Sequence, residues 1–266
     1  GVPLDNRLLA AEIEHILRDC AAAALILDAD LRDHAPTFGT PSDLRLIVEV
    51  STPTCTTQTA LRFDTIGAGL APAAEPVLEE EQDALIVYTS GTSGKPKGAV
   101  VSHFNLVHTV RHYDFAWRLG PDDRSMMAIP ATNITGLAAI ILTLMGAGGA
   151  VVYNRAFKAK DFLARAAQER ITHAFMVPAM YKLCLLNAEF DQHDLSSWRL
   201  GSYGGAIMPP ATIAEIADRL PNLRLMNGYG ATETTSPSVM LPGDLTASHS
   251  DSVGFALPCT ELCVMD

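Results

Sequence analysis

The feature that most constrains the fold is a regular alternation of short apolar segments with amphipathic ones. Segments with the length and composition of buried strands lie at residues 23–28, 44–50, 83–88, 124–129, 150–153, 172–177, 198–203, 224–227 and 262–265. Helical patterns lie at residues 105–116, 137–145 and 158–170, and further helices begin near Pro178 and Pro210. Ser102 is the predicted cap of the helix at residues 105–116. We therefore expect an α/β fold, with mainly parallel β-sheets covered by helices.

The ends of three predicted strands mark the candidate functional region. Open parallel sheets bind their ligands outside the carboxyl ends of the strands. Here the strands that end near residues 88, 203 and 227 each lead directly into a segment rich in glycine. Functional side chains are expected at these three junctions.

Composition argues against several partners and locations. The chain has 19 Lys and Arg residues against 30 Asp and Glu residues, a formal net charge of −11. It therefore lacks the basic surface that nucleic acid or anionic lipid requires. The uncharged stretch at residues 125–154 is broken by Pro130 and several glycines, which argues against an integral membrane span. Five cysteines without a CxxC pair argue against disulfide or zinc frameworks and favour a cytoplasmic location.

The first junction carries the loop YTSGTSGKPKGAV at residues 88–100. Its glycines let the backbone approach a phosphate closely, and consecutive amides can form a concavity that binds anions. Hydroxyl groups add donors, and two lysines add positive charge. The candidate phosphate-binding residues are Thr89, Ser90, Gly91, Thr92, Ser93, Gly94, Lys95 and Lys97.

The spacing of this loop differs from that of a P-loop NTPase, in which Gly-Lys-Ser/Thr opens a helix. Here Pro96 follows Lys95, and the apolar residues after Gly98 indicate a strand. A polar loop without a ligand is the alternative, but it poorly explains so many hydroxyl groups and two lysines beside a buried strand. The loop therefore indicates phosphate binding of another kind.

The second junction carries Gly204, Gly205 and Ala206. These residues form a small-residue surface against which a flat ring or an acyl chain could lie. A tight turn would have the same composition, so the segment alone indicates little.

The third junction carries NGYGATE at residues 227–233. Glycines on either side leave the ring of Tyr229 free to stack on a purine. Thr232 can donate to a phosphate oxygen, and Glu233 offers a hard oxygen ligand suited to Mg²⁺ that also contacts phosphates. The alternative is a polar turn, with Glu233 in a solvated salt bridge.

These motifs resemble those of the adenylate-forming superfamily, which includes acyl-CoA synthetases, firefly-luciferase-like enzymes and peptide-synthetase adenylation domains. YTSGTSGKPKG is similar to the family core TSG[ST]TGxPKG, with Ser93 replacing the more common Thr. NGYGATE matches the family motif YGxTE at every fixed position, and a matching Gly-Gly-Ala segment precedes it. The resemblance covers nearly the whole chain.

The resemblance implies specific roles. The loop would hold the β- and γ-phosphates of ATP, and residues 204–206 would line the adenine and acyl pocket. Asn227 would contact the base, Tyr229 would stack on adenine, and Thr232 would touch the α-phosphate. Glu233 would be the Mg²⁺ ligand. The predicted catalytic residues are Thr232, Glu233 and Lys97. Outside the loop, the predicted nucleotide-binding residues are Gly204, Gly205, Ala206, Asn227, Gly228, Tyr229, Gly230 and Thr232.

One position departs from the family pattern P-x-x-H-x-x-G, in which the His lies near the acyl carboxylate or the thiol channel. The chain has Asn133 there, and Asn cannot act as a general base. Asn133 can contact the substrate carboxylate or cap the next helix. Together with Gly205 and Ala206 it is the predicted contact for the acid. His108 and His112, one helical turn apart without a zincin Glu, are predicted to be surface histidines.

The implied reaction is ATP-dependent activation of a carboxylic acid to an acyl-adenylate, followed by thioester formation with coenzyme A. The implied enzyme is an AMP-forming acyl-CoA synthetase, of the kind used in fatty acid metabolism, with ATP, Mg²⁺ and coenzyme A. An adenylation domain that loads a carrier protein, and a fragment that binds ATP or acyl-AMP without turnover, stay open. Residues 1–266 are expected to form part of the large N-terminal AMP-binding domain, without the family's small C-terminal domain. A homodimer is also left open.

Overall fold

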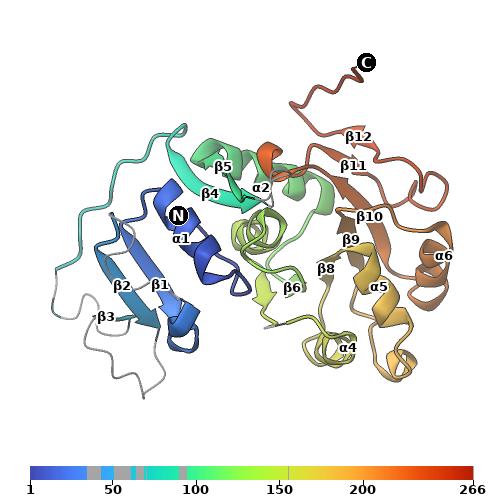
Figure 1. Cartoon of the computed structure of the whole chain (residues 1–266). Coiled ribbons are helices and arrows are strands. Elements are labelled where there is room, and N and C mark those ends of the chain that lie inside the picture. Colours follow the sequence, from blue (N-terminus) through green and yellow to red (C-terminus); the bar gives the residue numbers. More distant parts are fainter. Residues whose placement is uncertain are drawn as a thin grey trace. The chain divides into compact units, whose positions relative to one another are not determined.

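A computed structural model of the chain describes residues 1–34, 43–50, 61–63, 69, 71–89, 95–154 and 156–265. It divides into two units, residues 1–100 and residues 101–266, shown in Figure 1. Each unit builds its own sheets. Among the described residues, no helix is both long and apolar enough to cross a membrane.

The first unit contains a parallel sheet of three strands in the order β1-β2-β3 and a two-stranded sheet, β4-β5. The strands are β1 (Ala24–Asp28), β2 (Leu46–Val50), β3 (Leu61–Arg62), β4 (Asp83–Thr89) and β5 (Lys97–Ser102), preceded or joined by α1 (Ala10–Asp19) and η1 (Ala29–His34). A small core of Leu17, Leu25, Leu44 and Ile47 packs α1 against the parallel sheet.

The second unit is built on a seven-stranded sheet in the order β12-β11-β10-β9-β8-β6-β7. Its strands are β6 (Arg124–Met127), β7 (Ala150–Val152), β8 (His173–Met176), β9 (Leu200–Gly204), β10 (Arg224–Tyr229), β11 (Val239–Leu241) and β12 (Phe255–Ala256). The pairs from β7 to β10 are parallel, and β11 and β12 run antiparallel at one edge. The predicted α/β fold with a mainly parallel sheet is confirmed.

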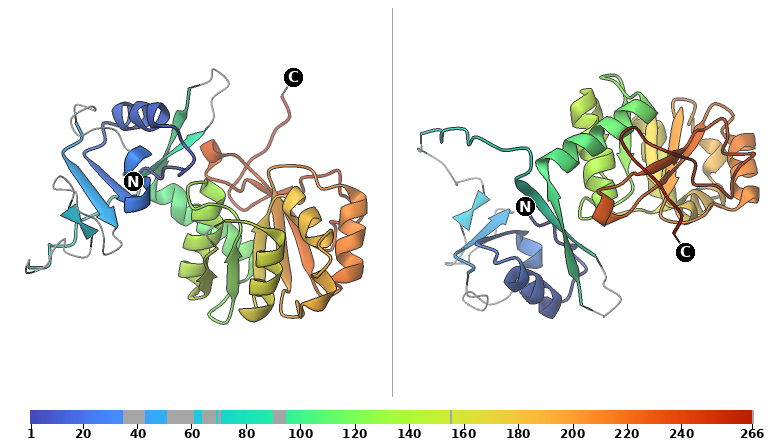
Figure 2. Two further views of the ribbon diagram at one scale, coloured as in Figure 1. Left: turned by 60° about the horizontal axis from the view of Figure 1, so that its bottom comes forward. Right: turned by 90° about the horizontal axis from the view of Figure 1, so that it is seen from above.

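Helices cover both faces of this sheet, as Figure 2 shows. The helices described in this unit are α2 (His103–Trp117), the π-helix η3 (Thr135–Leu142), α3 (Thr143–Ala147), α4 (Ala159–Gln168), α5 (Pro178–Leu185), η4 (Phe190–Gln192), α6 (Pro210–Arg219) and the short η5 (Thr232–Thr234), which has no buried residue. Alternate residues of strand β8 pack into two hydrophobic cores on opposite faces of the sheet. Ala174 and Met176 pack with residues of α4, α5 and α6, whereas Phe175 between them packs with residues of α2 and η3.

The helix start predicted at Ser102 is confirmed, with a reciprocal cap. The Ser102 hydroxyl accepts from the Asn105 backbone N–H at 3.2 Å, and the Asn105 side chain accepts from the Ser102 N–H at 3.0 Å. Such caps satisfy amides that the first helical turn leaves unpaired, and each contributes about 1 kcal/mol. This cap fixes where β5 ends and α2 begins.

Two local predictions were wrong. Residues 262–265 are exposed and do not form a strand, because no neighbouring strand pairs with them within the described part of the chain. The segment predicted as one α-helix at 137–145 is a π-helix followed by the short helix α3. At this junction the Thr143 hydroxyl donates to the carbonyl of Ala138, five residues earlier, at 2.9 Å. The edge strands β11 and β12 were not predicted from the sequence.

Candidate functional site

Two of the predicted motifs lie side by side at the carboxyl ends of adjacent strands. Strands β9 and β10 are parallel neighbours, and their register pairs Asn227 with Tyr203 and Gly228 with Gly204. The small-residue segment 204–206 therefore leaves the sheet next to the NGYGATE segment. This is the edge at which an open α/β sheet places its ligands.

Glycine is required at position 204 by the closeness of the two strands. A Cβ atom at Gly204 would lie 2.4 Å from the backbone oxygen of Gly228 and 3.2 Å from the ring of Phe175. After Gly204 the chain turns out of the sheet through Gly205, at φ +77°, and both Gly205 and Ala206 are exposed. The segment thus combines close packing inside the sheet with an open surface just beyond it.

The side chains of the NGYGATE segment differ in how far they are exposed to solvent. Asn227 is buried, and its Nδ2 donates to the carbonyl of Ser252 at 3.4 Å. At the end of β10, Tyr229 is 54% exposed, so its ring is accessible to a stacking ligand. Thr232 and Glu233 follow in η5, where Thr232 is half-buried and Glu233 is exposed.

Glu233 could hold Mg²⁺ only together with oxygen atoms of a ligand. Within the described residues, no group of three or more His, Cys, Asp or Glu side chains is placed to hold a metal ion. Mg²⁺ in nucleotide sites commonly takes one or two carboxylates and completes its shell with phosphate oxygens and water. One exposed carboxylate beside a hydroxyl therefore fits a Mg²⁺–nucleotide complex better than a metal site made of protein alone.

The turn that follows η5 has an unfavourable backbone held by contacts from helix α2. Thr235 and Ser236 have φ values of +57° and +37°, in a region that costs a non-glycine residue on the order of 1–3 kcal/mol. The Thr109 hydroxyl donates to the Thr235 carbonyl at 3.1 Å. His112 Nδ1 lies 3.2 Å from the carbonyl of Pro237. Local sequence gives no signal for these contacts, because their partners are more than a hundred residues apart.

The prediction that His112 is a surface histidine was wrong. His112 is buried, and its other ring nitrogen, Nε2, lies 2.8 Å from the carbonyl of Pro258. Its ring also packs edge-on against His108, with centroids 4.4 Å apart. A pattern of side chains along one helix could not reveal these partners, because they are backbone carbonyls of distant segments.

Asn133 follows β6, whose carboxyl end lies at the same edge of the sheet as those of β8, β9 and β10. Its Oδ1 accepts from the Thr135 backbone N–H at 2.8 Å, at the start of η3. Asn133 thus satisfies the first backbone N–H of η3, although Ile134, and not Asn133, occupies the N-cap position. The side chain is exposed, so its Nδ2 group can still donate to a ligand, and the substrate contact stays a prediction.

The phosphate-loop motif belongs to the first unit. Thr89 ends β4, Lys97 begins β5, and both lysines of the motif are exposed. The Tyr88 hydroxyl donates to Asp19 of α1 at 2.6 Å, and burial together with this hydrogen bond raises the pKa of Tyr88. Ser90, Gly91, Thr92, Ser93 and Gly94 lie outside the described residues, so their phosphate-binding role stays a prediction.

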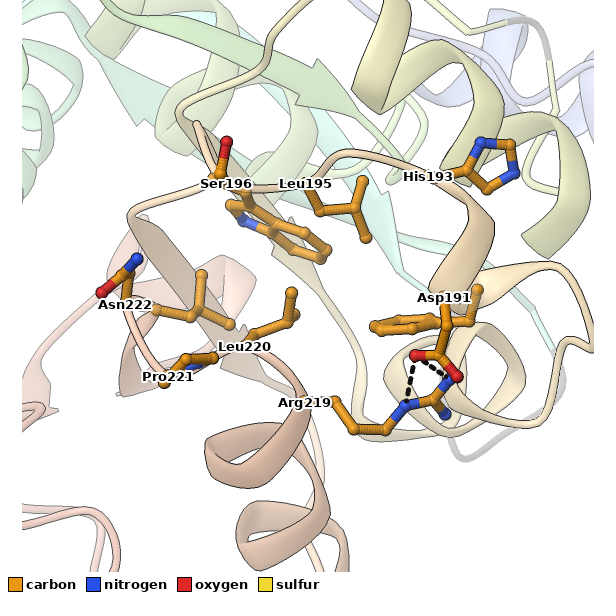
Figure 3. A pocket seen from close by; sticks show the side chains of 11 residues that line it. Asp191, His193, Leu195, Ser196, Arg219, Leu220, Pro221 and Asn222 are labelled. Carbon is orange, nitrogen blue, oxygen red and sulfur yellow. Dashed lines mark hydrogen bonds and ion pairs between the residues drawn. The ribbon is translucent and has the colours of Figure 1, made fainter.

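A separate cavity of about 310 Å³ lies near the amino ends of β9 and β10, and Figure 3 shows its lining. It is formed by the segments before these strands, including Trp198, Leu220 and Arg219, with Arg219 paired to Asp191 at 2.8 Å. The predicted site residues are absent from its lining. We therefore place the candidate site at the carboxyl ends of the strands, where two motifs converge, and not in this cavity.

Comparison with known proteins identifies the family. The chain matches the family described as AMP-binding enzyme over residues 1–266. The chain belongs to the AMP-binding enzyme family. The adenylate-forming resemblance inferred from the motifs is thereby confirmed.

Two relatives are named as a coenzyme A synthase and a coenzyme A ligase. The chain is 32% identical over 258 residues to a feruloyl-CoA synthase of an Amycolatopsis species, covering 95% of this chain and 48% of that protein. It is 28% identical over 271 residues to an indoleacetate–CoA ligase of Aromatoleum aromaticum strain EbN1, covering 99% of this chain and 51% of that protein. The chain thus spans about half the length of these curated relatives.

A solved structure supports the fold. The crystal structure of the anthranilate CoA ligase AuaEII in complex with anthranoyl-AMP superposes with a TM-score of 0.87 at 24% identity. The match covers 97% of this chain and 50% of that chain. The AMP-binding sequence therefore adopts the fold that its strand and helix pattern predicts.

Proposed function

We propose that this chain forms the nucleotide-binding part of an enzyme that activates a carboxylic acid with ATP and then transfers the acyl group to coenzyme A. The observation that carries the proposal is the register of β9 and β10. It brings the Gly204–Ala206 segment beside the NGYGATE segment at the ligand-binding edge of a parallel sheet. Membership of the AMP-binding enzyme family supports the same conclusion.

The proposed chemistry has two steps. An oxygen of the substrate carboxylate attacks the α-phosphorus of ATP, the bond from that phosphorus to the bridging oxygen breaks, and pyrophosphate leaves. The thiol of coenzyme A, as its thiolate, then attacks the acyl carbonyl, and AMP leaves with the bonding electrons. Both steps depend mainly on positioning and on neutralising phosphate charge.

We assign roles to this chain's residues accordingly. The exposed ring of Tyr229 stacks on the adenine, and Asn227 contacts the base at the wall of the pocket. Thr232 donates to the α-phosphate, and Lys97 with the loop at residues 89–95 holds the β- and γ-phosphates. Mg²⁺ held by Glu233 would neutralise charge on the phosphate oxygens.

The open surface of Gly205 and Ala206 and the Nδ2 donor of Asn133 are proposed to contact the acid. An Asn at position 133 supplies a neutral donor that does not titrate. Substrate recognition through this residue would therefore not depend on pH, as recognition through a His would.

The direct test is pyrophosphate release from ATP and Mg²⁺ with a panel of acids, with the acyl-adenylate identified by mass spectrometry after an acid quench. The panel begins with aromatic acids, since the two relatives are named for ferulate and indoleacetate, and includes fatty acids of increasing length. We expect release with a restricted set of acids and none without acid. Binding of ATP without release for any acid would make the chain a binder, not a catalyst.

The acceptor is tested separately. Free coenzyme A should convert the acyl-adenylate to a thioester that chromatography resolves. If the adenylate forms but free coenzyme A does not accept the acyl group, whereas the phosphopantetheine arm of a carrier protein does, the coenzyme A assignment is wrong and the carrier assignment is right.

A further inference from the structure

Three side chains on one face of α2 contact three consecutive residues of the turn that follows η5. Thr109 donates to the carbonyl of Thr235 at 3.1 Å, and His112 Nδ1 lies 3.2 Å from the carbonyl of Pro237. The hydroxyl groups of Tyr113 and Ser236 lie 3.4 Å apart. Positions 109, 112 and 113 are three and four residues apart, so they lie on one face of the helix.

The backbone conformation of this turn is unfavourable by itself and is held by contacts from other parts of the chain. Thr235 and Ser236 both have positive φ values, which a β-branched and a polar residue with a Cβ atom rarely adopt. Conformations of this kind persist when the surrounding structure fixes them, and they cluster at functional sites. Thr235 is buried, so its carbonyl has little access to water when Thr109 does not donate to it.

The same turn is tied directly to the residues that the proposed function uses. The Thr235 N–H donates to the Thr232 carbonyl at 3.0 Å, and the Ser236 N–H donates to the Ala231 carbonyl at 3.1 Å. A displacement of the turn therefore displaces Thr232 and, next to it, Glu233.

His112 adds a second anchor through Nε2, which lies 2.8 Å from the carbonyl of Pro258, just after β12. Its two ring nitrogens thus each face one backbone carbonyl, and which nitrogen donates depends on the tautomer. The residue joins α2 to both segments that flank the antiparallel edge of the sheet. His112 is buried, and its contact with the Pro237 carbonyl is buried as well, whereas its contact with the Pro258 carbonyl is partly buried.

We propose that Thr109, His112 and Tyr113 are positioning residues that hold the 235–237 turn and thereby preorganise Thr232 and Glu233 for the Mg²⁺–nucleotide complex. They do not touch the ligand. The proposal rests on the proposed function for its ligand, but the holding of the turn is a property of the chain alone. Groups that are already held in place bind a ligand without the cost of being ordered first. Loss of the contacts from Thr109, His112 and Tyr113 should therefore lower the affinity for the Mg²⁺–nucleotide complex, although these residues do not touch it.

The test compares Thr109→Val with a matched control, Thr143→Val, and a rescue variant, Thr109→Ser. Both threonines are buried, and each donates to one backbone carbonyl, at 3.1 Å from Thr109 and 2.9 Å from Thr143. Val keeps the branched shape of Thr and replaces the hydroxyl with a methyl group, whereas Ser keeps the hydroxyl and lacks the methyl group. The readouts are hydrogen exchange of the peptide covering residues 231–238 and the Kd for ATP with Mg²⁺.

Thr109→Val should raise exchange in residues 231–238 and weaken binding of ATP with Mg²⁺ about tenfold, the usual scale for one buried hydrogen bond. Thr143→Val should leave exchange in that peptide and the Kd within about twofold of wild type, and Thr109→Ser should stay close to wild type. Unchanged exchange in Thr109→Val, or equal effects in Thr109→Val and Thr143→Val, would overturn the proposal. If wild type does not bind ATP with Mg²⁺, the proposed function fails. The exchange measurement still decides whether Thr109 holds the turn at residues 235–237.

Discussion

Replacing Gly204 by Ala tests the juxtaposition on which the candidate site depends. The new Cβ would lie 2.4 Å from the backbone oxygen of Gly228, whereas real Cβ atoms essentially never come closer than 3.0 Å. The atoms must therefore separate by at least 0.6 Å, which is 3.0 minus 2.4. The clashing atom belongs to the backbone of β10, which β9 pairs along five consecutive positions, so a side-chain rotation cannot relieve the contact.

Overpacking of this kind costs typically 1–3 kcal/mol, and a clash with backbone belongs at the upper end. We expect Gly204→Ala to lower the free energy of unfolding of the second unit by about 3 kcal/mol. With a urea m-value of about 2 kcal/mol/M, the unfolding midpoint should fall by about 1.5 M.

The matched control is Gly228→Ala on the paired strand. A Cβ at Gly228 would meet its nearest neighbours at 3.7–3.9 Å, which is ordinary contact, so its effect should stay within about 1 kcal/mol. Tryptophan fluorescence is the assay, because both tryptophans of the chain, Trp117 and Trp198, are buried in the second unit. Equal midpoints for the two variants, or a Gly204→Ala midpoint close to wild type, would show that β9 and β10 do not pair as described.

Three further predictions concern the second unit. Burial lowers the pKa of His173 from 6.5 to about 3, so the folded chain binds fewer protons than the unfolded chain between these values. Stability should be full above pH 6.5 and fall toward pH 3 by up to about 1.4 kcal/mol per pH unit, and urea titrations of His173→Gln should lack this part of the slope. Asp123→Asn should lower the free energy of unfolding by about 2 kcal/mol, because the buried Asp123 carboxylate accepts from Arg199 at 2.7 and 2.8 Å. Urea denaturation measures this, and a change below about 0.5 kcal/mol would contradict the prediction. Tyr229→Ala should weaken ATP binding, measured by calorimetric titration, about tenfold. Its free energy of unfolding should stay within about 1 kcal/mol of wild type, since Tyr229 is half exposed. Tyr229→Phe keeps the ring and should bind ATP as wild type does in the same titration.

The parts of the site that the sequence predicts are those whose signal is local. The predicted strands that end at Tyr203 and Asn227 are each followed at once by glycine, and this local pattern marks a carboxyl end without any knowledge of distant contacts. The Ser102 cap is likewise visible, because its partner Asn105 is three residues away.

The parts that the sequence does not predict depend on long-range contacts or on small differences in period. Thr109 and Thr235 are 126 residues apart, and neither residue type indicates the other. The π-helical geometry of η3 could not be told from an α-helix over eight mostly apolar residues, because several registers fit the pattern equally well. The segment at 262–265 has strand-like residues, but a strand also requires a neighbour, which the local pattern cannot supply.

The central claim is that the carboxyl ends of β9 and β10 bind the adenosine monophosphate part of the ligand. The most direct measurement is a hydrogen-exchange footprint of the chain with saturating AMP. We expect protection at residues 203–206 and 227–233, and loss of this protection in Tyr229→Ala. Protection confined to the peptides that line the cavity around Trp198 and Arg219, or no protection at all, would contradict it.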